Sequence, residues 1–375
     1  MKNGRKKCTV VNNEETGIWE EKTKNEMLRY LLVVYFQNCE DMAFVKKVYE
    51  RLQCRAYHST FLTNQNENEH LMVFKNCVLN LITRECLPFS PDYYALGRAD
   101  YDYVKDAKCE KFLAYLDSIF QNAPDGEQLI KLLQEAVGLS LTKITYFQKM
   151  FFLLGEGGNG KNVFAEILST LIGEHQVSYL PLSDLNAKFA LANLDNKLVN
   201  IDSDAGIHSL QKTQSKFKAV VGGDKISVDK KFERYFTLFP HCKLWVLTNH
   251  MPKVDNDSNG LYRRITIIPF NRIFEEHEQD KNLVHSLKSE ISGILLWSLE
   301  GLDRLLKNGN FTVAPSSTEA LKAYKLQNNS NNSKHKSKPI YIKLEQIASE
   351  QDNPLNDFVM NKLKGGNYTV TKFHV

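Results

Sequence analysis

A glycine-rich turn followed by a lysine, GEGGNGKN at residues 155–162, constrains this 375-residue chain more than any other feature. The apolar run MFFLLG (150–155) precedes it with the length of a buried strand, and GKNVFAEILSTLIG (160–173) follows with helical spacing. This order aims backbone N–H groups and the positive helix end at an anion. The pattern matches G-x-x-x-x-G-K-[ST], except that Asn162 replaces Ser or Thr. We predict a phosphate-binding loop; the alternative is an ordinary strand-to-helix turn rich in glycine.

Further apolar runs of strand length follow the loop at KLVNID (197–202), KLWVLT (243–248) and RITIIPF (264–270). Helical patterns separate them, and a long helical stretch follows from about residue 280 to residue 307. Strands that alternate with helices are typical of an α/β fold with a mostly parallel sheet. Amphipathic patterns before the loop, with two short strands among them, predict a mainly helical region there.

These patterns divide the chain into five predicted segments. They are a flexible N-terminus (1–20), a mainly helical domain (21–145), an α/β domain with the glycine-rich loop (146–310), a helical end with a polar linker (311–338), and a small C-terminal appendage of unknown role (339–375). The linker prediction rests on the polar, low-complexity stretch LQNNSNNSKHKSK. Its lysines either add unspecific affinity for phosphate or are simply solvated.

Composition excludes several classes of protein. The chain has 42% hydrophobic and 25% charged residues, which is ordinary for a globular protein, and its net charge of +4 does not by itself indicate nucleic acid. The seven cysteines are scattered, odd in number and without zinc spacing, so we expect reduced thiols. No apolar run is long enough to span a bilayer, and no secretory signal is visible. We expect a cytoplasmic protein without a membrane partner.

The candidate ligands of the cofactors ATP and Mg²⁺ lie in the loop and after the next strand. A nucleotide site of this type needs acidic groups at a neighbouring strand end to hold Mg²⁺. Asp202 ends such a strand and Asp204 lies two residues further on, and they share one face if the strand extends that far. Asn162 offers a carbonyl oxygen to the metal. The predicted ATP-phosphate contacts are Gly155, Glu156, Gly157, Gly158, Asn159, Gly160, Lys161, Asn162 and Val163, and the predicted Mg²⁺ ligands are Asn162, Asp202 and Asp204.

Two further polar pairs lie at the ends of buried strands. Thr248 and Asn249 end one strand, where a side chain can contact a γ-phosphate or the attacking water; the alternative is a strand-terminating turn. Arg263 and Arg264 precede the last strand, where an arginine can neutralise charge in a neighbouring subunit's site. The alternative for this pair is a solvated strand edge.

The glycine-rich loop, the two aspartates, the polar pair Thr248-Asn249 and the paired arginines form a series. In order and spacing this series resembles the superfamily 3 helicases of the phage, plasmid and poxvirus primase–helicase type. The matching stretches are GEGGNGKN, KLVNIDSD, VVGGDKISVDKKFERYFTLFPHCKLWVLTNHMP and DSNGLYRRITIIPF, and the resemblance covers about residues 65–325. It implies an AAA+-like ATPase core that forms a ring, usually a hexamer, with ATP between subunits. It also implies catalytic roles for five residues. Lys161 would contact phosphate, Asp204 would be the Walker B acid, and Asn249 would be the polar sensor residue. Arg263 or Arg264 would be the arginine finger.

This chain departs from the family at Asn162 and at Asp204, where the family has Ser or Thr and usually Glu. Both positions belong to the contacts with the metal and the attacking water, so the changes bear on ATP turnover more than on nucleotide binding. Nothing before residue 150 resembles a polymerising domain, so we do not expect priming activity. A separate primase or origin-binding protein is then a further expected partner.

The stretch GGDKISVDKKFERYF (222–236) alternates like a hairpin and carries basic residues near its tip. In the family a hairpin here lines the central channel, and basic groups track phosphates without reading bases. Phe232 or Tyr235 would stack on a base. The alternative is an ordinary solvated hairpin. The predicted contacts with single-stranded or forked DNA are Lys225, Lys230, Lys231 and Arg234.

We therefore expect a ring-forming, ATP-dependent DNA helicase of a mobile element, phage or plasmid. One rival is a catalytically weakened relative that binds ATP and DNA during loading or assembly without unwinding. A second rival is a small-molecule P-loop kinase, which would be a monomer or dimer. The paired arginines after Asn249 argue against the kinase.

Overall fold

The computed structural model describes residues 9–13, 15–55, 69–206, 210, 213–229, 236–254 and 259–336. The chain divides into a compact unit over residues 1–329 and a second unit over residues 330–375, of which only the helical residues 330–336 are described. Within the described residues, no helix combines the length and the hydrophobicity that crossing a bilayer requires.

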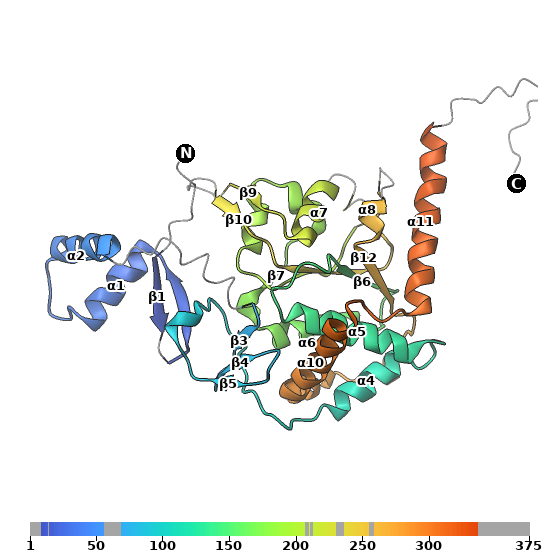
Figure 1. The fold of residues 1–375 in the computed structure, drawn as a ribbon, viewed down its shortest axis with the longest axis horizontal. Helices are drawn as coiled ribbons and strands as arrows, with labels where there is room; N and C mark the ends of the chain where they lie inside the picture. Colours follow the sequence, from blue (N-terminus) through green and yellow to red (C-terminus); the bar gives the residue numbers. More distant parts are fainter. Residues whose placement is uncertain are drawn as a thin grey trace, which may run out of the picture. The chain divides into compact units, whose positions relative to one another are not determined.

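A five-stranded parallel sheet forms the centre of the first unit (Figure 1). Its strand order is β12-β6-β11-β8-β7, and every neighbouring pair runs parallel. The predicted α/β fold with a mostly parallel sheet is confirmed. The strands are β6 (Met150–Leu154), β7 (Val177–Ser178), β8 (Val199–Asp202), β11 (Lys243–Thr248) and β12 (Ile265–Pro269).

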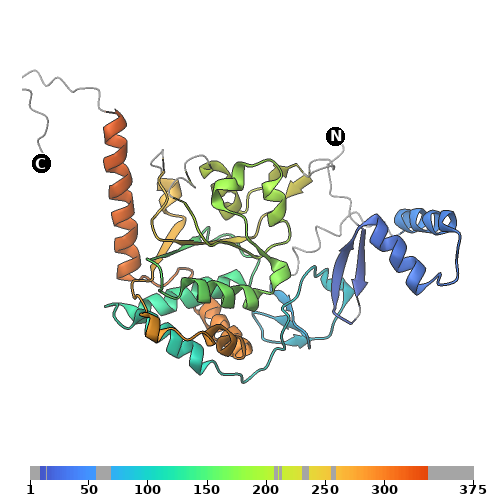
Figure 2. The ribbon, with the colours of Figure 1, turned by 180° about the vertical axis from the view of Figure 1, so that it is seen from behind.

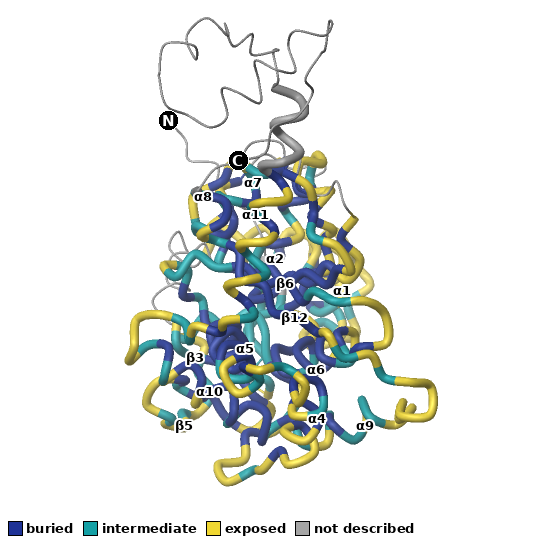
Figure 3. The backbone as a smooth tube through the Cα atoms, turned by 90° about the vertical axis from the view of Figure 1, so that its right-hand side faces the viewer, coloured by how far each residue is buried: buried dark blue, intermediate teal, exposed yellow. Residues whose placement is uncertain are grey.

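Both faces of the sheet are buried, which explains why its strands are continuous apolar runs. Along β6, Phe151 and Leu153 join one core cluster, whereas Met150 and Phe152 join the other. Figures 1 and 2 show α4, α5, α6 and α10 on one side of the sheet and α7 on the other. Figure 3 colours the strands β6 and β12 of this sheet almost entirely as buried. The helices on the first side are α4 (Glu110–Phe120), α5 (Gly126–Ser140), α6 (Lys161–Ile172) and α10 (Ile291–Asn308), and Leu287 of α9 (Leu283–Lys288) joins the same core cluster.

The opposite face is covered by several short elements together with part of a long helix. Its core includes Phe217, Tyr262 and Tyr324, and the rings of Tyr262 and Tyr324 meet edge to face at 5.6 Å. These elements are α7 (Gln214–Gly222), β9 (Ile226–Val228), β10 (Phe236–Leu238), α8 (Asn259–Tyr262), α11 (Pro315–Lys336) and the 3₁₀ turns η3 (Leu182–Asn186) and η4 (Ala190–Leu194).

The region before the sheet mixes helices with two small antiparallel sheets. Leu28, Leu31, Val45 and Tyr49 form a small core of their own between two helices. The elements are β1 (Thr9–Asn13), β2 (Ile18–Lys22), α1 (Lys24–Val34), α2 (Met42–Arg55), β3 (Leu71–Val73), β4 (Val78–Asn80), β5 (Cys86–Leu87) and η1 (Pro91–Tyr93).

Two sequence predictions are wrong at the ends of the described chain. The predicted flexible N-terminus contains the hairpin β1–β2, which is tied to the chain because Trp19 donates from its backbone N–H to Ala95 O (2.7 Å) and from its indole to Pro91 O (2.8 Å). The predicted polar linker is helical as far as Lys336, because α11 continues through the Asn- and Ser-rich stretch. The predicted appendage at 339–375 lies outside the described residues.

Two predicted helical stretches are helical in the structure, but each is divided into two helices. The first lies at the start of the mainly helical domain predicted at 21–145 and forms α1 and α2, and the second, over 280–307, forms α9 and α10. In α1, Thr23 and Glu26 form a reciprocal capping box that fixes where the helix begins. The two short strands that were predicted within residues 70–94 are β3 and β4, and β5 is a third strand in that stretch. The remaining 3₁₀ turns are η2 (Glu174–Gln176) and η5 (Glu276–Glu278).

Candidate functional site

The glycine-rich loop connects the carboxyl end of β6 to the first residue of α6, as predicted. Gly158 and Gly160 have φ angles of 71° and 87°, in the left-handed region that favours glycine. Gly160 is also the residue before the helix, so the loop ends directly at the N-terminus of α6. Gly157 is exposed, and a Cβ added there would meet nothing within 4 Å. The loop is thus open on one side and close to the positive end of a helix.

The other side of the loop packs against the chain that leaves β12. A Cβ on Gly155 would lie 2.1 Å from Phe270 O, so only glycine fits there. Asn159 is buried, and its Nδ2 donates to the same Phe270 oxygen at 3.0 Å. Asn159 therefore holds the loop in shape rather than presenting its side chain to a ligand.

Lys161 is buried at the start of α6, and its ammonium lies inside the loop. Nζ donates to Gly155 O, to Glu156 O (3.0 Å) and to Asn159 Oδ1 (3.1 Å). Burial lowers the pKa of Lys161 from its ordinary value. The predicted phosphate-contacting lysine is therefore a cation at the centre of the loop, surrounded by neutral oxygens.

The neighbouring strand β11 brings Asn249 to the loop. Thr248 pairs with Leu154 on β6, and Gly155 N donates to Thr248 O at 3.2 Å. Asn249 follows directly, and its Oδ1 lies 3.5 Å from Lys161 Nζ. Thr248 itself is buried and donates to Ala205 O (3.1 Å) and His250 O (2.6 Å), so it links two strand ends. Of this polar pair, Asn249 lies at the loop.

The two candidate carboxylates do not share a face, because β8 ends at Asp202. Asp202 is buried, and its Oδ2 accepts from Leu182 N at 2.8 Å. Its burial raises its pKa above the ordinary value, although backbone N–H bonds oppose this. Asp204 is exposed, and the next residue is joined to β11 because Ala205 N donates to Leu247 O at 3.3 Å. Asp204 is thus the carboxylate that remains accessible at the carboxyl edge of the sheet, while Asp202 supports η3.

The other predicted phosphate and metal contacts lie in the first turn of α6 and in the loop. Asn162 is exposed there, and Val163 is half-buried and packs against a core cluster. Glu156 is exposed, and its backbone oxygen accepts from Lys161. Asn162 and Asp204, which both follow Lys161 in the sequence, are therefore accessible side chains that offer oxygen atoms to a metal, whereas Val163 offers its backbone alone.

Arg263 and Arg264 lie at the opposite edge of the sheet from the loop. They precede β12, whose first residue Ile265 pairs with Met150 at the start of β6. Arg263 is exposed and donates to Gln148 Oε1 at 3.2 Å, and Arg264 donates to Gly260 O at 2.5 Å. The structure does not bring either arginine to the glycine-rich loop of its own chain.

The predicted hairpin is present as the antiparallel pair β9–β10. Lys225, immediately before it, is exposed, and its Nζ lies 5.4 Å from the ring centre of the half-exposed Phe239. The other predicted DNA contacts, Lys230, Lys231 and Arg234, and the aromatic residues Phe232 and Tyr235, lie outside the described residues.

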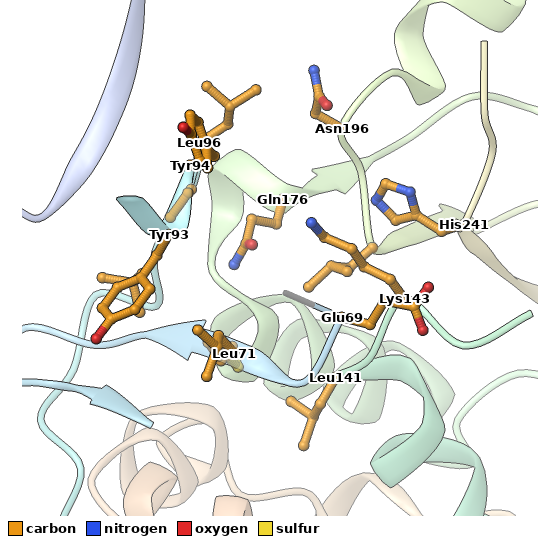
Figure 4. A pocket seen from close by; sticks show the side chains of 15 residues that line it. Glu69, Leu71, Tyr93, Tyr94, Leu96, Leu141, Lys143, Gln176, Asn196 and His241 are labelled. Atoms are coloured by element: carbon orange, nitrogen blue, oxygen red, sulfur yellow. The ribbon is translucent and has the colours of Figure 1, made fainter. Parts of the chain in front are cut away.

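A cavity of about 50 Å³ lies at the amino ends of the strands, away from the loop (Figure 4). Gln176, Leu198 and His241, which precede β7, β8 and β11, line it together with Lys143. Burial lowers the pKa of Lys143 to about 8 and that of His241 to about 3. The volume suits a few water molecules. It is far too small for a nucleotide.

Sequence reasoning missed the residues that support the loop from behind. Tyr115 on α4 donates its hydroxyl to Gly160 O at 2.9 Å, and Phe274 N donates to Gly158 O at 2.8 Å. Tyr115 stood out only as one apolar position of an amphipathic helix, and Phe274 only as part of an irregular segment. No local pattern connects either residue to the loop.

The fold and the loop define a class: a parallel α/β domain with a glycine-rich loop and a buried lysine at the carboxyl edge of its sheet. Residues 6–121 match a family model described as D5 N terminal like. Residues 153–264 match a family of unknown function, DUF5906. The second match runs from β6 to the paired arginines. The first begins well before residue 65, where the resemblance noted from the sequence starts.

The chain is similar to a viral protein with a helicase-like name. The Putative helicase L207/L206 of Acanthamoeba polyphaga mimivirus is 22% identical over 233 residues, which is 60% of this chain and 24% of that protein. The Uncharacterized mitochondrial protein ymf21 of Marchantia polymorpha is 25% identical over 141 residues, 34% of this chain and 77% of that protein. The chain thus spans about a quarter of the length of the mimivirus relative.

Among solved structures, one similar chain is described as the A form apo structure of NrS-1 C terminal region. It is 19% identical, with a TM-score of 0.45, and the match covers 70% of this chain and 59% of that chain.

Proposed function

We propose that this protein is an ATP-dependent DNA helicase that forms a ring and acts in the replication of a virus, phage or plasmid. One observation carries the proposal: β11 lies between β6 and β8, so that Asn249 lies 3.5 Å from the loop lysine while Asp204 follows the adjacent strand. ATP hydrolysis requires, at one edge of the sheet, a cation that contacts the phosphates, a polar side chain near the γ-phosphate and an acidic side chain. The similarity to a viral protein named putative helicase supports the same proposal.

The loop residues fit a triphosphate. Gly157 leaves open space on the exposed side, and the helix N-terminus and Lys161 supply positive charge there. ATP would be held by backbone N–H groups of residues 156–163, whereas the Gly155 N–H donates to Thr248 O instead. It would also be held by the Lys161 ammonium, which would exchange its carbonyl partners for phosphate oxygens. The driving force for this exchange is a charged acceptor in place of neutral ones.

The residues also fit Mg²⁺, which neutralises phosphate charge when it is bound. Asn162 and Asp204 would hold it, since both side chains are exposed and both offer oxygen. Asp202 is a poorer ligand than the sequence indicated, because its oxygens accept from Leu182 N and Asp204 N. Asn249 would orient the attacking water. We expect Asp204→Asn to abolish turnover, and Asp202→Asn to retain much of it with an intact fold.

The arginines and the hairpin enter the proposal through oligomerisation. Arg263 and Arg264 lie at the sheet edge opposite the loop, so they would act on ATP held by a neighbouring copy. Lys225 and the hairpin residues Lys230, Lys231 and Arg234 would contact the phosphates of single-stranded DNA. A monomer or dimer in size-exclusion chromatography with ATP and DNA would favour the small-molecule kinase instead.

The decisive experiment measures ATP hydrolysis with Mg²⁺, with and without single-stranded DNA, for the parent, Lys161→Ala and Asn162→Ser. The helicase predicts turnover that DNA stimulates and that Lys161→Ala abolishes. If Asn162→Ser alone hydrolyses ATP, the result supports the alternative of a catalytically weakened relative. Asn162 at the metal position is the feature that favours this alternative. An absence of ATP binding in all three proteins would overturn the proposal.

A further inference from the structure

Three consecutive residues of the glycine-rich loop are held from behind by parts of the chain that are distant in sequence. Gly158 O accepts from Phe274 N (2.8 Å), Asn159 Nδ2 donates to Phe270 O (3.0 Å), and Gly160 O accepts from the Tyr115 hydroxyl (2.9 Å). Two of these contacts come from the chain after β12. The third comes from α4, in the part of the chain before the sheet.

These contacts fix the direction of the loop's N–H groups. In a trans peptide the carbonyl and the next N–H point in opposite directions. Holding Gly158 O and Gly160 O toward the protein therefore fixes the orientation of the next N–H groups, those of Asn159 and Lys161. The Lys161 N–H donates within the loop, to Asn159 Oδ1 at 3.4 Å. Gly160 O also accepts from Phe164 N at 3.0 Å in the first turn of α6, so the Tyr115 hydroxyl is its second donor.

Tyr115 is itself rigidly placed. Its side chain is buried, packs against Phe112 and lies next to Gly160, where an added Cβ would meet the hydroxyl at 3.2 Å. The N-terminus of α4 is capped because Lys111 N and Phe112 N donate to Glu290 at 3.2 and 3.1 Å. Any movement of α4 therefore moves the hydroxyl that supports the loop.

Arg272 completes the support by joining α4 to the chain after β12. Its Nη1 donates to Ser118 O (2.7 Å), and the Ser118 hydroxyl donates to Tyr115 O (2.7 Å). Its guanidinium also lies 4.5 Å from the ring centre of Phe274, whose N–H supports Gly158. The two sources of support are thus one connected set of contacts.

We propose that Tyr115 is a positioning residue of the nucleotide site, which makes α4 part of the ATP-binding machinery although it precedes the sheet by a whole helix. The inference rests on the proposed function, since it names how the same loop is held for ATP. It adds that the region before the sheet and the nucleotide affect each other through one hydroxyl.

The test compares Tyr115→Phe with Tyr101→Phe. The control is matched, because the Tyr101 hydroxyl also donates to a backbone oxygen of α6, Leu171 O at 3.0 Å, but at the far end of the helix. We expect Tyr115→Phe to weaken ATP binding in calorimetric titration by about fivefold, the effect of one hydrogen bond. We also expect faster hydrogen–deuterium exchange in the peptide that contains residues 155–163. Tyr101→Phe should leave both quantities at the parent value.

The outcomes separate this inference from the proposed function. If the parent and Tyr101→Phe bind ATP and Tyr115→Phe binds it equally well with unchanged exchange, Tyr115 has no positioning role although the nucleotide site stands. If the parent binds no ATP, both ideas are overturned. Should Tyr115→Phe fold poorly, Arg272→Met provides the second variant, with a smaller loss of affinity expected in the same direction. Parent-like affinity in Arg272→Met would then count against the connected support.

Discussion

Gly155 and Gly157 lie two residues apart in the loop, and alanine should have different effects at the two positions. Gly155→Ala should lower the stability of the fold, whereas Gly157→Ala should lower the affinity for ATP. A Cβ on Gly155 would lie 2.1 Å from Phe270 O and 2.5 Å from Asn159 Nδ2. The Phe270 oxygen belongs to the backbone next to β12 and cannot rotate away, so the loop or the strand must move. A Cβ on Gly157 would meet nothing within 4 Å.

The expected magnitudes follow from these distances. Overpacking of a close contact costs about 1–3 kcal/mol. Loss of the hydrogen bond between Asn159 and Phe270 adds about 1 kcal/mol. Gly155→Ala should therefore lower the free energy of unfolding by about 2–4 kcal/mol. Gly157→Ala should leave it within about 1 kcal/mol of the parent, on the favourable side if the unfolded chain loses freedom.

The assay is urea unfolding of both variants, followed by ATP titration of the folded proteins. Gly157→Ala should keep its stability and lose ATP affinity, because its methyl group projects into the open side of the loop. Gly155→Ala should lose stability first. The reasoning is refuted if Gly155→Ala is as stable as the parent, or if Gly157→Ala destabilises the protein as strongly as Gly155→Ala does.

Two further predictions concern buried charges away from the loop. Burial lowers the pKa of Lys243 to about 7. Above that pH the folded chain has released this proton, whereas the unfolded chain keeps it up to the ordinary lysine pKa. The free energy of unfolding therefore rises with pH from about 7 to 10, by up to about 1.4 kcal/mol per pH unit. Lys243→Met should flatten this dependence in thermal unfolding from pH 7 to 9, and an equal slope in both proteins would contradict it. Arg304→Met should destabilise by about 3 kcal/mol, since it leaves the fully buried Glu135 without its cation at 2.7 Å. Lys131→Met, which breaks an exposed pair, should cost under about 0.5 kcal/mol in the same urea titration.

Short-range patterns were sufficient for the strand, loop and helix around residues 150–172. Each rests on contacts within a few residues: an apolar run buried on both faces, glycines where φ is positive, and an amphipathic helix. The hairpin β1–β2 escaped notice because polar side chains occupy much of it, and its anchors lie at residues 91–95. The helical end of α11 escaped because Asn and Ser have low helix propensity.

Positions near the site were harder to assign than its elements. Asp202 and Asp204 look equivalent in sequence, yet only the pairing of β8 and the fold of η3 make one buried and the other accessible. Asn249 could be expected near the loop only if β11 adjoins β6, and strand order is a long-range property. Arg263 and Arg264 could not be placed at either sheet edge until β12 was known to run parallel to β6.

The sequence by itself determined that a buried strand, a tight glycine turn with a lysine and a helix follow one another, because steric limits and hydrophobic periodicity act over neighbouring residues. Only the tertiary structure decided which groups surround that lysine. Tyr115, 45 residues upstream of Gly160, and Phe270, 111 residues downstream of Asn159, reach the loop through packing of the whole α/β unit. Contacts at such separations depend on the burial of both sheet faces at once, and no local pattern encodes that.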